Sequence, residues 1–121
     1  MADSPNPMRA PWADIAPELT EISNDVLFDS VWQRPELSPR DRSLVTISAL
    51  IAGYRQNELP FHMKKALENG VTRDEIVETI THLAFYSGWP TASTALTVAR
   101  QVFAENGQVQ TQSKETGHAD A

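Results

Sequence analysis

The sequence contains no cysteine among its 121 residues. This absence excludes disulfide bonds, thiol nucleophiles, CxxC redox pairs and thiolate metal sites. Hydrophobic residues make up 40% and charged residues 21% of the chain, which is typical of a folded protein rather than a disordered one. The length suits one domain with a real core and is too short for two.

Positive charge is scarce. The chain has 10 Lys and Arg against 16 Asp and Glu, for a net charge of -6. This balance argues against nucleic acid or an anionic membrane as a partner. A small anionic organic substrate would need cations gathered locally.

Long hydrophobic runs are also missing. The apolar run at 49–52 is far too short to span a bilayer, and the first twelve residues lack the apolar stretch of a signal peptide. We therefore expect a cytoplasmic protein with no membrane partner.

The two ends of the chain differ in composition from its middle. Four of the eight prolines lie within the first 17 residues, and the residues after Gly107 offer almost nothing to bury. We expect a flexible N-terminal arm over 1–16 that packs locally through Trp12, a helical domain over 17–107 and a disordered tail over 108–121.

Between the ends, every strong signal is helical. Apolar residues recur at helical spacing, and Pro or Gly marks most of the boundaries. Ser38-Pro39 and Thr72 followed by Glu75 are typical helix beginnings. The sequence predicts an all-α fold with five helices, at about 17–33, 39–53, 58–69, 73–87 and 90–107.

The predicted fourth helix has two apolar faces. The expected core face carries Ile76, Ile80, Leu83, Ala84 and Ser87, while the opposite face carries Phe85 and Trp89. A solvent face does not normally hold two large aromatic residues, so we expect this second face to meet another subunit. The third helix repeats the pattern, with Phe61 pointing away from its core residues, Leu59, Met63 and Ala66.

Two helices each offer a histidine one turn from a glutamate: Glu58 with His62, and Glu78 with His82. Such pairs suit acid-base chemistry, but they are also ordinary i,i+4 helix pairs, and a helix histidine among aromatic residues is often structural. A metal site of two His and two Glu is the weaker alternative because no HExxH motif is present. Arg42 and Arg55, near the two ends of the second helix, are candidate anion ligands.

Two longer segments carry a recognisable pattern. LSPRDRSLVTISALIA and LPFHMKKALENGVTRDEIVETITHLAFYSGWP resemble the carboxymuconolactone decarboxylase family over roughly residues 25–105. The resemblance implies the all-α fold of the alkyl hydroperoxidase D-like proteins. It also implies a homo-oligomeric ring, commonly a trimer or hexamer, with active sites near subunit contacts.

The redox branch of that superfamily carries C-x-x-C-x-x-x-H on the helix corresponding to the third one here. Alignment on His62 puts Glu58 and Arg55 where the two cysteines would be, so the resemblance excludes peroxidase chemistry. It leaves a histidine with a carboxylate beside it, which suits proton transfer.

The resemblance implies a decarboxylase acting on a small carboxylated lactone such as 4-carboxymuconolactone, in aromatic catabolism and without a cofactor or metal. We expect His62 with Glu58 to be the acid-base pair and His82 a second donor or orienting group. Arg42 and Arg55 are candidate substrate ligands, and Tyr86 and Trp89 candidate pocket walls. Two alternatives stay open: a different reaction of a small carbonyl acid, such as isomerisation or dehydration, and a non-catalytic oligomeric scaffold.

Overall fold

The computed structural model describes the backbone of residues 8–114 and the side chains of residues 8–106. Every regular element in this part of the chain is a helix, as the sequence predicts. The chain divides into two compact units, one ending at Pro39 and one beginning at Arg40. None of the described helices is both long enough and apolar enough to cross a membrane.

The first unit contains a helix interrupted by irregular turns. It comprises the α-helix α1 (Pro17–Ile22), the π-helical turn η1 (Ser23–Phe28) and the 3-10 turn η2 (Val31–Gln33). The predicted single helix over 17–33 is therefore wrong in its second half. Ser, Asn and Asp side chains are frequent there and compete for backbone hydrogen bonds, which weakens a regular α-helix.

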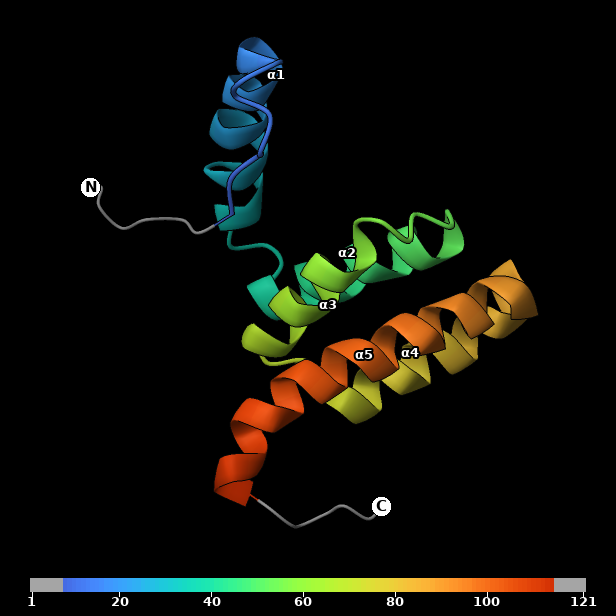
Figure 1. Ribbon diagram of the computed structural model, residues 1–121. Coiled ribbons are helices and arrows are strands. Elements are labelled where there is room, and N and C mark those ends of the chain that lie inside the picture. Colours follow the sequence, from blue (N-terminus) through green and yellow to red (C-terminus); the bar gives the residue numbers. More distant parts are fainter. Residues whose placement is uncertain (1–7, 115–121) are drawn as a thin grey trace. The chain divides into compact units, whose positions relative to one another are not determined.

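Residues 8–16 run back along this helix (Figure 1). The Arg9 guanidinium pairs with the Asp29 carboxylate at 3.0 Å, and the backbone N–H of Ala10 donates to the Asn24 side-chain oxygen at 2.8 Å. The described part of the predicted arm thus makes polar contacts and buries Met8, which is 4% exposed, while Trp12 stays 41% exposed. Residues 1–7 of that arm lie outside the described residues.

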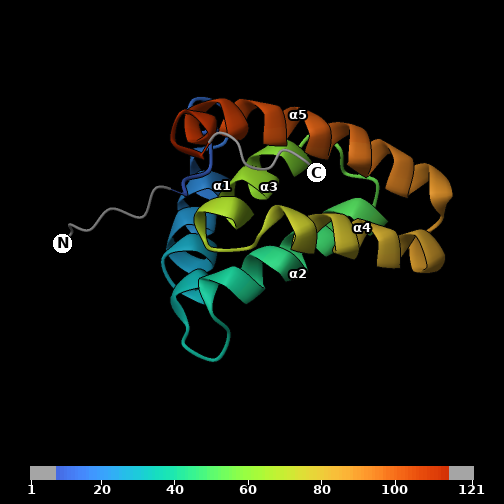
Figure 2. The ribbon, with the colours of Figure 1, turned by 90° about the horizontal axis from the view of Figure 1, so that it is seen from below.

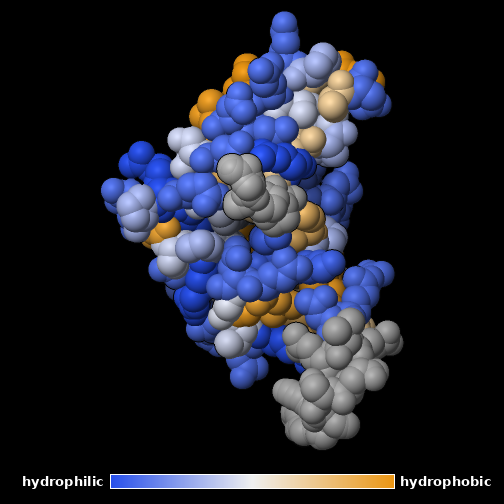
Figure 3. Space-filling model, turned by 90° about the vertical axis from the view of Figure 1, so that its left-hand side faces the viewer, coloured by the Kyte–Doolittle hydropathy of each residue, from blue (hydrophilic) through white to orange (hydrophobic). Residues whose placement is uncertain are grey.

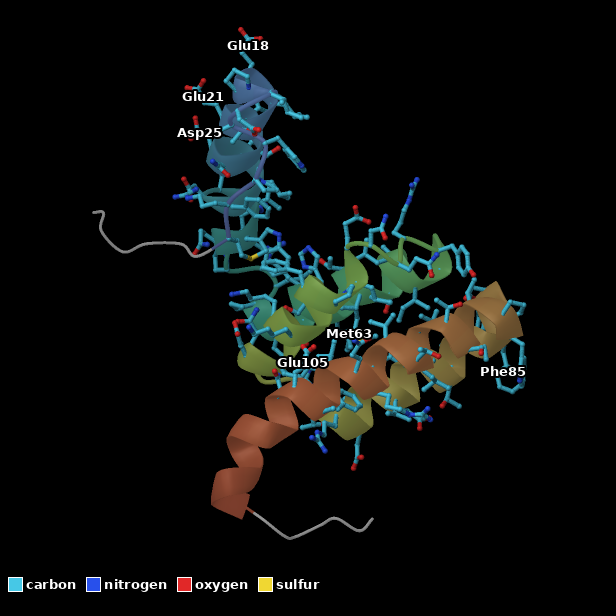
Figure 4. All side chains as sticks on the ribbon, viewed as in Figure 1. Glu18, Glu21, Asp25, Met63, Phe85 and Glu105 are labelled. Atoms are coloured by element: carbon cyan, nitrogen blue, oxygen red, sulfur yellow. The ribbon has the colours of Figure 1, made fainter. Side chains whose placement is uncertain are left out.

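The apolar residues that recur at helical spacing along 17–33 are only partly buried. Trp32 is buried and Val31 is half-buried, but Leu19, Ile22 and Val26 stay more than half exposed. An acidic row of Glu18, Glu21 and Asp25 lies along α1 and η1 (Figure 4).

The second unit is a four-helix arrangement of α2 (Pro39–Ala52), α3 (Leu59–Glu68), α4 (Arg73–Ser87) and α5 (Trp89–Lys114). Gly88 separates α4 from α5, so these two helices run antiparallel and side by side (Figures 1 and 2). α5 packs against both α3 and α4.

The core of this unit is built from one face of each helix. Met63 of α3 is fully buried and lies between α3 and α5 (Figure 4). The predicted core faces of α3 and α4 are confirmed, since all their members are buried or half-buried. On α5, the apolar residues at helical spacing are Ala92, Leu96, Ala99 and Phe103. Of these, Ala92 and Ala99 are buried and Phe103 is half-buried, whereas Leu96 is 43% exposed, and Ala95 and Val102 complete the buried face.

The predicted end of the fifth helix before Gly107 is wrong, because α5 continues to Lys114. A helix tolerates an internal glycine at a cost of about 1 kcal/mol, and no proline follows Gly107 to stop it. The rest of the predicted tail, residues 115–121, lies outside the described residues.

Two helices end in the same backbone motif with different residues at its key position. At the end of α3, Gly70 has a φ of 104° and donates to the Leu67 carbonyl. At the end of α2, that left-handed position is taken by Tyr54, with a φ of 58°. Residues other than glycine seldom adopt this backbone conformation, so the turn after α2 is locally strained at Tyr54. The Tyr54 hydroxyl lies 3.3 Å from Thr94 Oγ1 of α5.

Polar contacts attach α2 to the rest of the unit. The Arg40 guanidinium binds both Asp41 and Glu75 of α4, and Asn69 donates a hydrogen bond of 2.9 Å to the buried Ser43 hydroxyl. Glu75 also accepts from the Thr72 backbone N–H, and these bonds hold the pKa of Glu75 below its usual range.

The capping box predicted at Thr72 is present and can be tested. The Thr72 hydroxyl accepts from the Glu75 backbone N–H at 3.0 Å. We expect Thr72→Ala to lower the free energy of unfolding by about 1 kcal/mol, measured by chemical denaturation, because it removes this bond from the first turn of α4. Thr72→Ser keeps the hydroxyl and is the matched control. Equal stability of the two variants would show that the cap contributes nothing.

Candidate functional site

His62 is the most enclosed of the histidines that the structure describes. It lies in the first turn of α3, next to the fully buried Met63, and is itself half-buried. Its ring stands edge-on to the ring of Phe61, with centroids 5.0 Å apart. The helix thus holds the imidazole at the boundary between core and surface.

Two charges of opposite sign act on His62. Glu58 precedes α3 by one residue, and its backbone carbonyl accepts the His62 N–H at 3.4 Å. Burial lowers the pKa of His62 below its ordinary value, the Glu58 carboxylate opposes this shift, and the Lys65 ammonium adds to it. The predicted pair of Glu58 and His62 is therefore electrostatically coupled, and Lys65 is a third member that the sequence analysis missed.

Lys65 itself is held close to the helix. Its side chain is only 13% exposed, pairs with Glu68 at 3.0 Å and lies 5.9 Å above the Phe61 ring. A positive charge fixed in this way disfavours protonation of the imidazole. Its spacing of three residues from His62 was the available signal in the sequence.

Arg55 lies in the connection between α2 and α3, on the N-terminal side of Glu58. Its backbone N–H donates to the Leu50 carbonyl at 2.8 Å, and its own carbonyl accepts from the Glu58 N–H at 3.3 Å. The strained Tyr54 turn therefore fixes the backbone of Arg55 while its side chain stays exposed. Arg42, the other predicted anion ligand, is half-buried in the first half of α2.

His82 and Tyr86 form a second cluster, on α4. Their rings stack with centroids 4.8 Å apart and an interplanar angle of 20°. Both residues are exposed, Tyr86 to 78%. The structure thus brings together two residues that were predicted separately, His82 as a donor or orienting group and Tyr86 as a pocket wall, whereas it places His62 in a more enclosed setting on a different helix.

Trp89, the remaining predicted site residue, belongs to a third cluster. Its ring meets that of Phe85 edge to face, at 5.1 Å and 74°. Both rings border an open groove of about 450 Å³ between α4 and α5, whose other lining residues include Leu96, Thr97 and Arg100. Neither His62 nor His82 lines this groove. The groove is therefore not a pocket around the predicted acid-base residues.

No group of three or more His, Asp or Glu side chains that could hold a metal ion occurs between residues 8 and 106. The two histidine-glutamate pairs lie on different helices. The geometry of the described residues therefore offers no metal centre.

Comparison with known proteins places most of the chain in one family. The model of the carboxymuconolactone decarboxylase family matches residues 17–101. A 4-carboxymuconolactone decarboxylase of Acinetobacter baylyi is 44% identical over 80 residues, which cover 66% of this chain and 60% of that protein.

Two further relatives are more distant. A nitrosuccinic acid decarboxylase of Metarhizium robertsii is 37% identical over 81 residues, which cover 67% of this chain and 57% of that protein. An uncharacterised 15.0 kDa protein of Paracoccus denitrificans is 28% identical over 96 residues, which cover 78% of this chain and 72% of that protein. The chain thus matches about three fifths of the length of each of the two decarboxylases.

The charges around His62 make a prediction that needs no substrate. We expect Lys65→Gln to raise the pKa of His62, because a nearby positive charge is removed, and Glu58→Gln to lower it, because a negative charge is removed. A pH titration of the His62 ring protons by NMR measures both shifts. Lys64→Gln, on the neighbouring exposed residue, is the control. Shifts of the opposite sign would refute the proposed coupling.

Proposed function

The chain belongs to the carboxymuconolactone decarboxylase family. We propose that it is a carboxy-lyase that acts on a small carboxylated lactone, and 4-carboxymuconolactone is the first substrate to test. Two relatives named as decarboxylases support the reaction class. The nitrosuccinic acid decarboxylase among them makes a small dicarboxylic acid with an electron-withdrawing group the second candidate. The predicted role in aromatic catabolism and the predicted cytoplasmic location stay predictions.

The observation that carries the proposal is the setting of His62. The imidazole is half-buried, its pKa is lowered by burial, and it is coupled to Glu58 on one side and Lys65 on the other. A general acid works best when its pKa lies near the working pH, and opposing charges of this kind are a usual way to adjust it. We propose His62 as the catalytic acid and Glu58 as the residue that orients it.

The chemistry needs no cofactor. The bond between the ring carbon and its carboxylate breaks, CO2 leaves, and the electron pair moves through the ring double bond to the lactone carbonyl. The resulting extended enolate then takes one proton at a ring carbon and the carbonyl re-forms, so that the product carries one hydrogen more and one CO2 less than the substrate anion. The protein has to bind the carboxylates, stabilise negative charge on the carbonyl oxygen and deliver one proton.

The remaining predicted residues fit supporting roles. Arg55, held on the N-terminal side of Glu58, and Arg42 on α2 are proposed to bind carboxylate or the developing oxyanion. The stacked pair of His82 and Tyr86 is proposed to orient substrate, with Trp89 helping to exclude water. Because His82, Tyr86 and Trp89 are exposed, this role depends on assembly into the homo-oligomeric ring, a trimer or hexamer, that we also propose.

The substrate is tested by incubating purified protein with 4-carboxymuconolactone and, separately, with nitrosuccinic acid while measuring CO2 release. We expect turnover of the lactone. Turnover of nitrosuccinic acid alone would move the proposal to that class of acid. A folded oligomer that turns over neither substrate would favour the alternative of a non-catalytic scaffold.

The role of His62 is tested by His62→Gln, which keeps a polar side chain but cannot act as an acid at neutral pH. We expect kcat to fall by about 100-fold or more, in line with the usual contribution of a positioned acid. His82→Gln should cost less, because that residue is proposed only to orient substrate. Lys64→Gln is the control for a polar change on the exposed side of α3, and circular dichroism checks that each variant folds. Wild-type kcat in His62→Gln would exclude the proposed acid.

The pH profile gives a second, independent test. An acid must be protonated, so kcat should fall as the pH rises through the pKa of His62. Lys65→Gln raises that pKa and should move the descending limb to higher pH, whereas Glu58→Gln should move it to lower pH. Limbs that do not move with either variant would assign the titrating acid to another residue.

A further inference from the structure

The open groove between α4 and α5 is not explained by the proposed chemistry. Its buried lining residues are apolar: Ile80 and the small side chains of Ala84 and Ala92. Two large aromatic rings border it at one end, Phe85 with 73% and Trp89 with 63% of their surface exposed. A monomer rarely exposes an aromatic patch of this kind, so a partner is expected to cover it.

The two aromatic rings form a preorganised projection. Phe85 lies in the last turn of α4 and Trp89 begins α5, and their edge-to-face contact at 5.1 Å holds each ring against the other. The side of the molecule seen in Figure 3 is mostly hydrophilic, with hydrophobic residues in separate patches, whereas Phe85 lies at the far right of the α4–α5 pair in Figure 4. The projection therefore belongs to the side hidden in Figure 3.

A positive charge borders the other end of the same groove. Arg100 of α5 is exposed, and no ion pair involving it occurs among the side chains that the structure describes. The guanidinium lies about 16 Å along α5 from Trp89 at the usual rise per residue. Arginine binds the faces of aromatic rings well, and tryptophan best of all.

The groove is thus complementary to a second copy of itself. We propose that two copies of the chain pair through this face about a two-fold axis, each placing its Phe85 and Trp89 in the other's groove, beside Arg100. A two-fold axis repeats every contact, so if Trp89 of one copy meets Arg100 of the other, Arg100 of the first copy also meets Trp89 of the second. A parallel arrangement is disfavoured because it would set Arg100 against Arg100.

The proposal specifies the middle of the interface as well. If Trp89 of one copy meets Arg100 of the other along antiparallel α5 helices, Ser93 of one copy faces Leu96 of the other. Both residues lie on the groove lining. This pairing deepens the proposed homo-oligomer. Trp89 is shared with the proposed site, but Phe85 and Arg100 have no role in the proposed reaction, so variants of these two residues test the pairing apart from catalysis.

The mass of the assembly tests the interface. We expect Arg100→Glu and Phe85→Ala each to halve the mass found by light scattering coupled to size exclusion, because a two-fold contact joins copies in pairs whether the full assembly is a dimer or a hexamer. Lys64→Glu makes the same change of charge on the exposed side of α3 and should leave the mass unchanged. Unchanged mass in both interface variants, or a monomeric wild-type protein, would overturn the proposal.

The lack of cysteine allows a direct test of the geometry. Ser93→Cys and Leu96→Cys proteins are mixed in equal amounts and oxidised, and mass spectrometry identifies the disulfides. Random pairing of equal amounts already gives twice as much mixed disulfide as either homodisulfide, so we expect the mixed disulfide to exceed this two-fold ratio clearly. The random ratio, an excess of homodisulfides, or no disulfide would overturn the antiparallel pairing.

Two other occupants of the groove give distinct results. If Leu19→Ser, on the exposed stripe of α1, halves the mass while Arg100→Glu does not, the partner element is α1 of another copy. If benzoate, used as a probe, perturbs the NMR signals of Leu96 and Arg100 in an assembly whose mass neither interface variant changes, the groove binds a small carboxylate. Either result would overturn the pairing proposed here.

Discussion

The close approach of α5 to its neighbours is the constraint on which the second unit depends. Ala92, Ala95 and Ala99 are nearly inaccessible and recur on one face of that helix. Because helices pack closer when the side chains between them are small, this row lets α5 lie against α3 and α4 together and bury Met63, Ile76 and Ile80. The contact between α5 and its neighbours is filled by small side chains. Larger apolar residues lie at the surface instead, among them Phe85, Trp89 and Leu96.

The burial of the candidate acid, His62, depends on the same packing of α3 against α5. His62 directly precedes Met63, which is fully buried against α5, so the core determines how deeply the imidazole sits. Its depth matters because burial is the largest influence on the pKa of His62, ahead of Glu58 and Lys65. Two charged residues lie about one turn away in the sequence, Glu58 four residues before His62 and Lys65 three residues after it. Core packing and local charge thus act together on one titratable group.

Periodicity and boundary residues predict much of this second unit, because each local signal agrees with the tertiary packing. Gly70, Gly88 and the Thr72 capping box all lie where helices begin or end. The sequence prediction was wrong or incomplete at positions where a second interaction opposed the usual preference of a residue for a turn, a helix end or a helix interior. Tyr54 holds a left-handed turn beside Gly53, α5 continues through Gly107, and polar side chains divide the first helix. The groove was missed because Leu96 follows the same apolar period as Ala92 and Ala99, yet Leu96 is exposed while the two alanines face the core.

The scarcity of positive charge constrains how an anion can be held near His62. Arg40 is bound to Asp41 and Glu75, Lys65 to Glu68, and Arg73 donates to the Phe103 carbonyl, so these three cations already have partners within the fold. Arg55 is different, because its backbone is fixed by hydrogen bonds while its side chain stays exposed on the N-terminal side of Glu58. In the proposed reaction, a substrate carboxylate bound by Arg55 would bring negative charge toward Glu58 and His62. Negative charge raises the pKa of an imidazole. Binding of the proposed substrate would then oppose the lowering of the His62 pKa by burial and Lys65, and so favour proton uptake by the proposed acid.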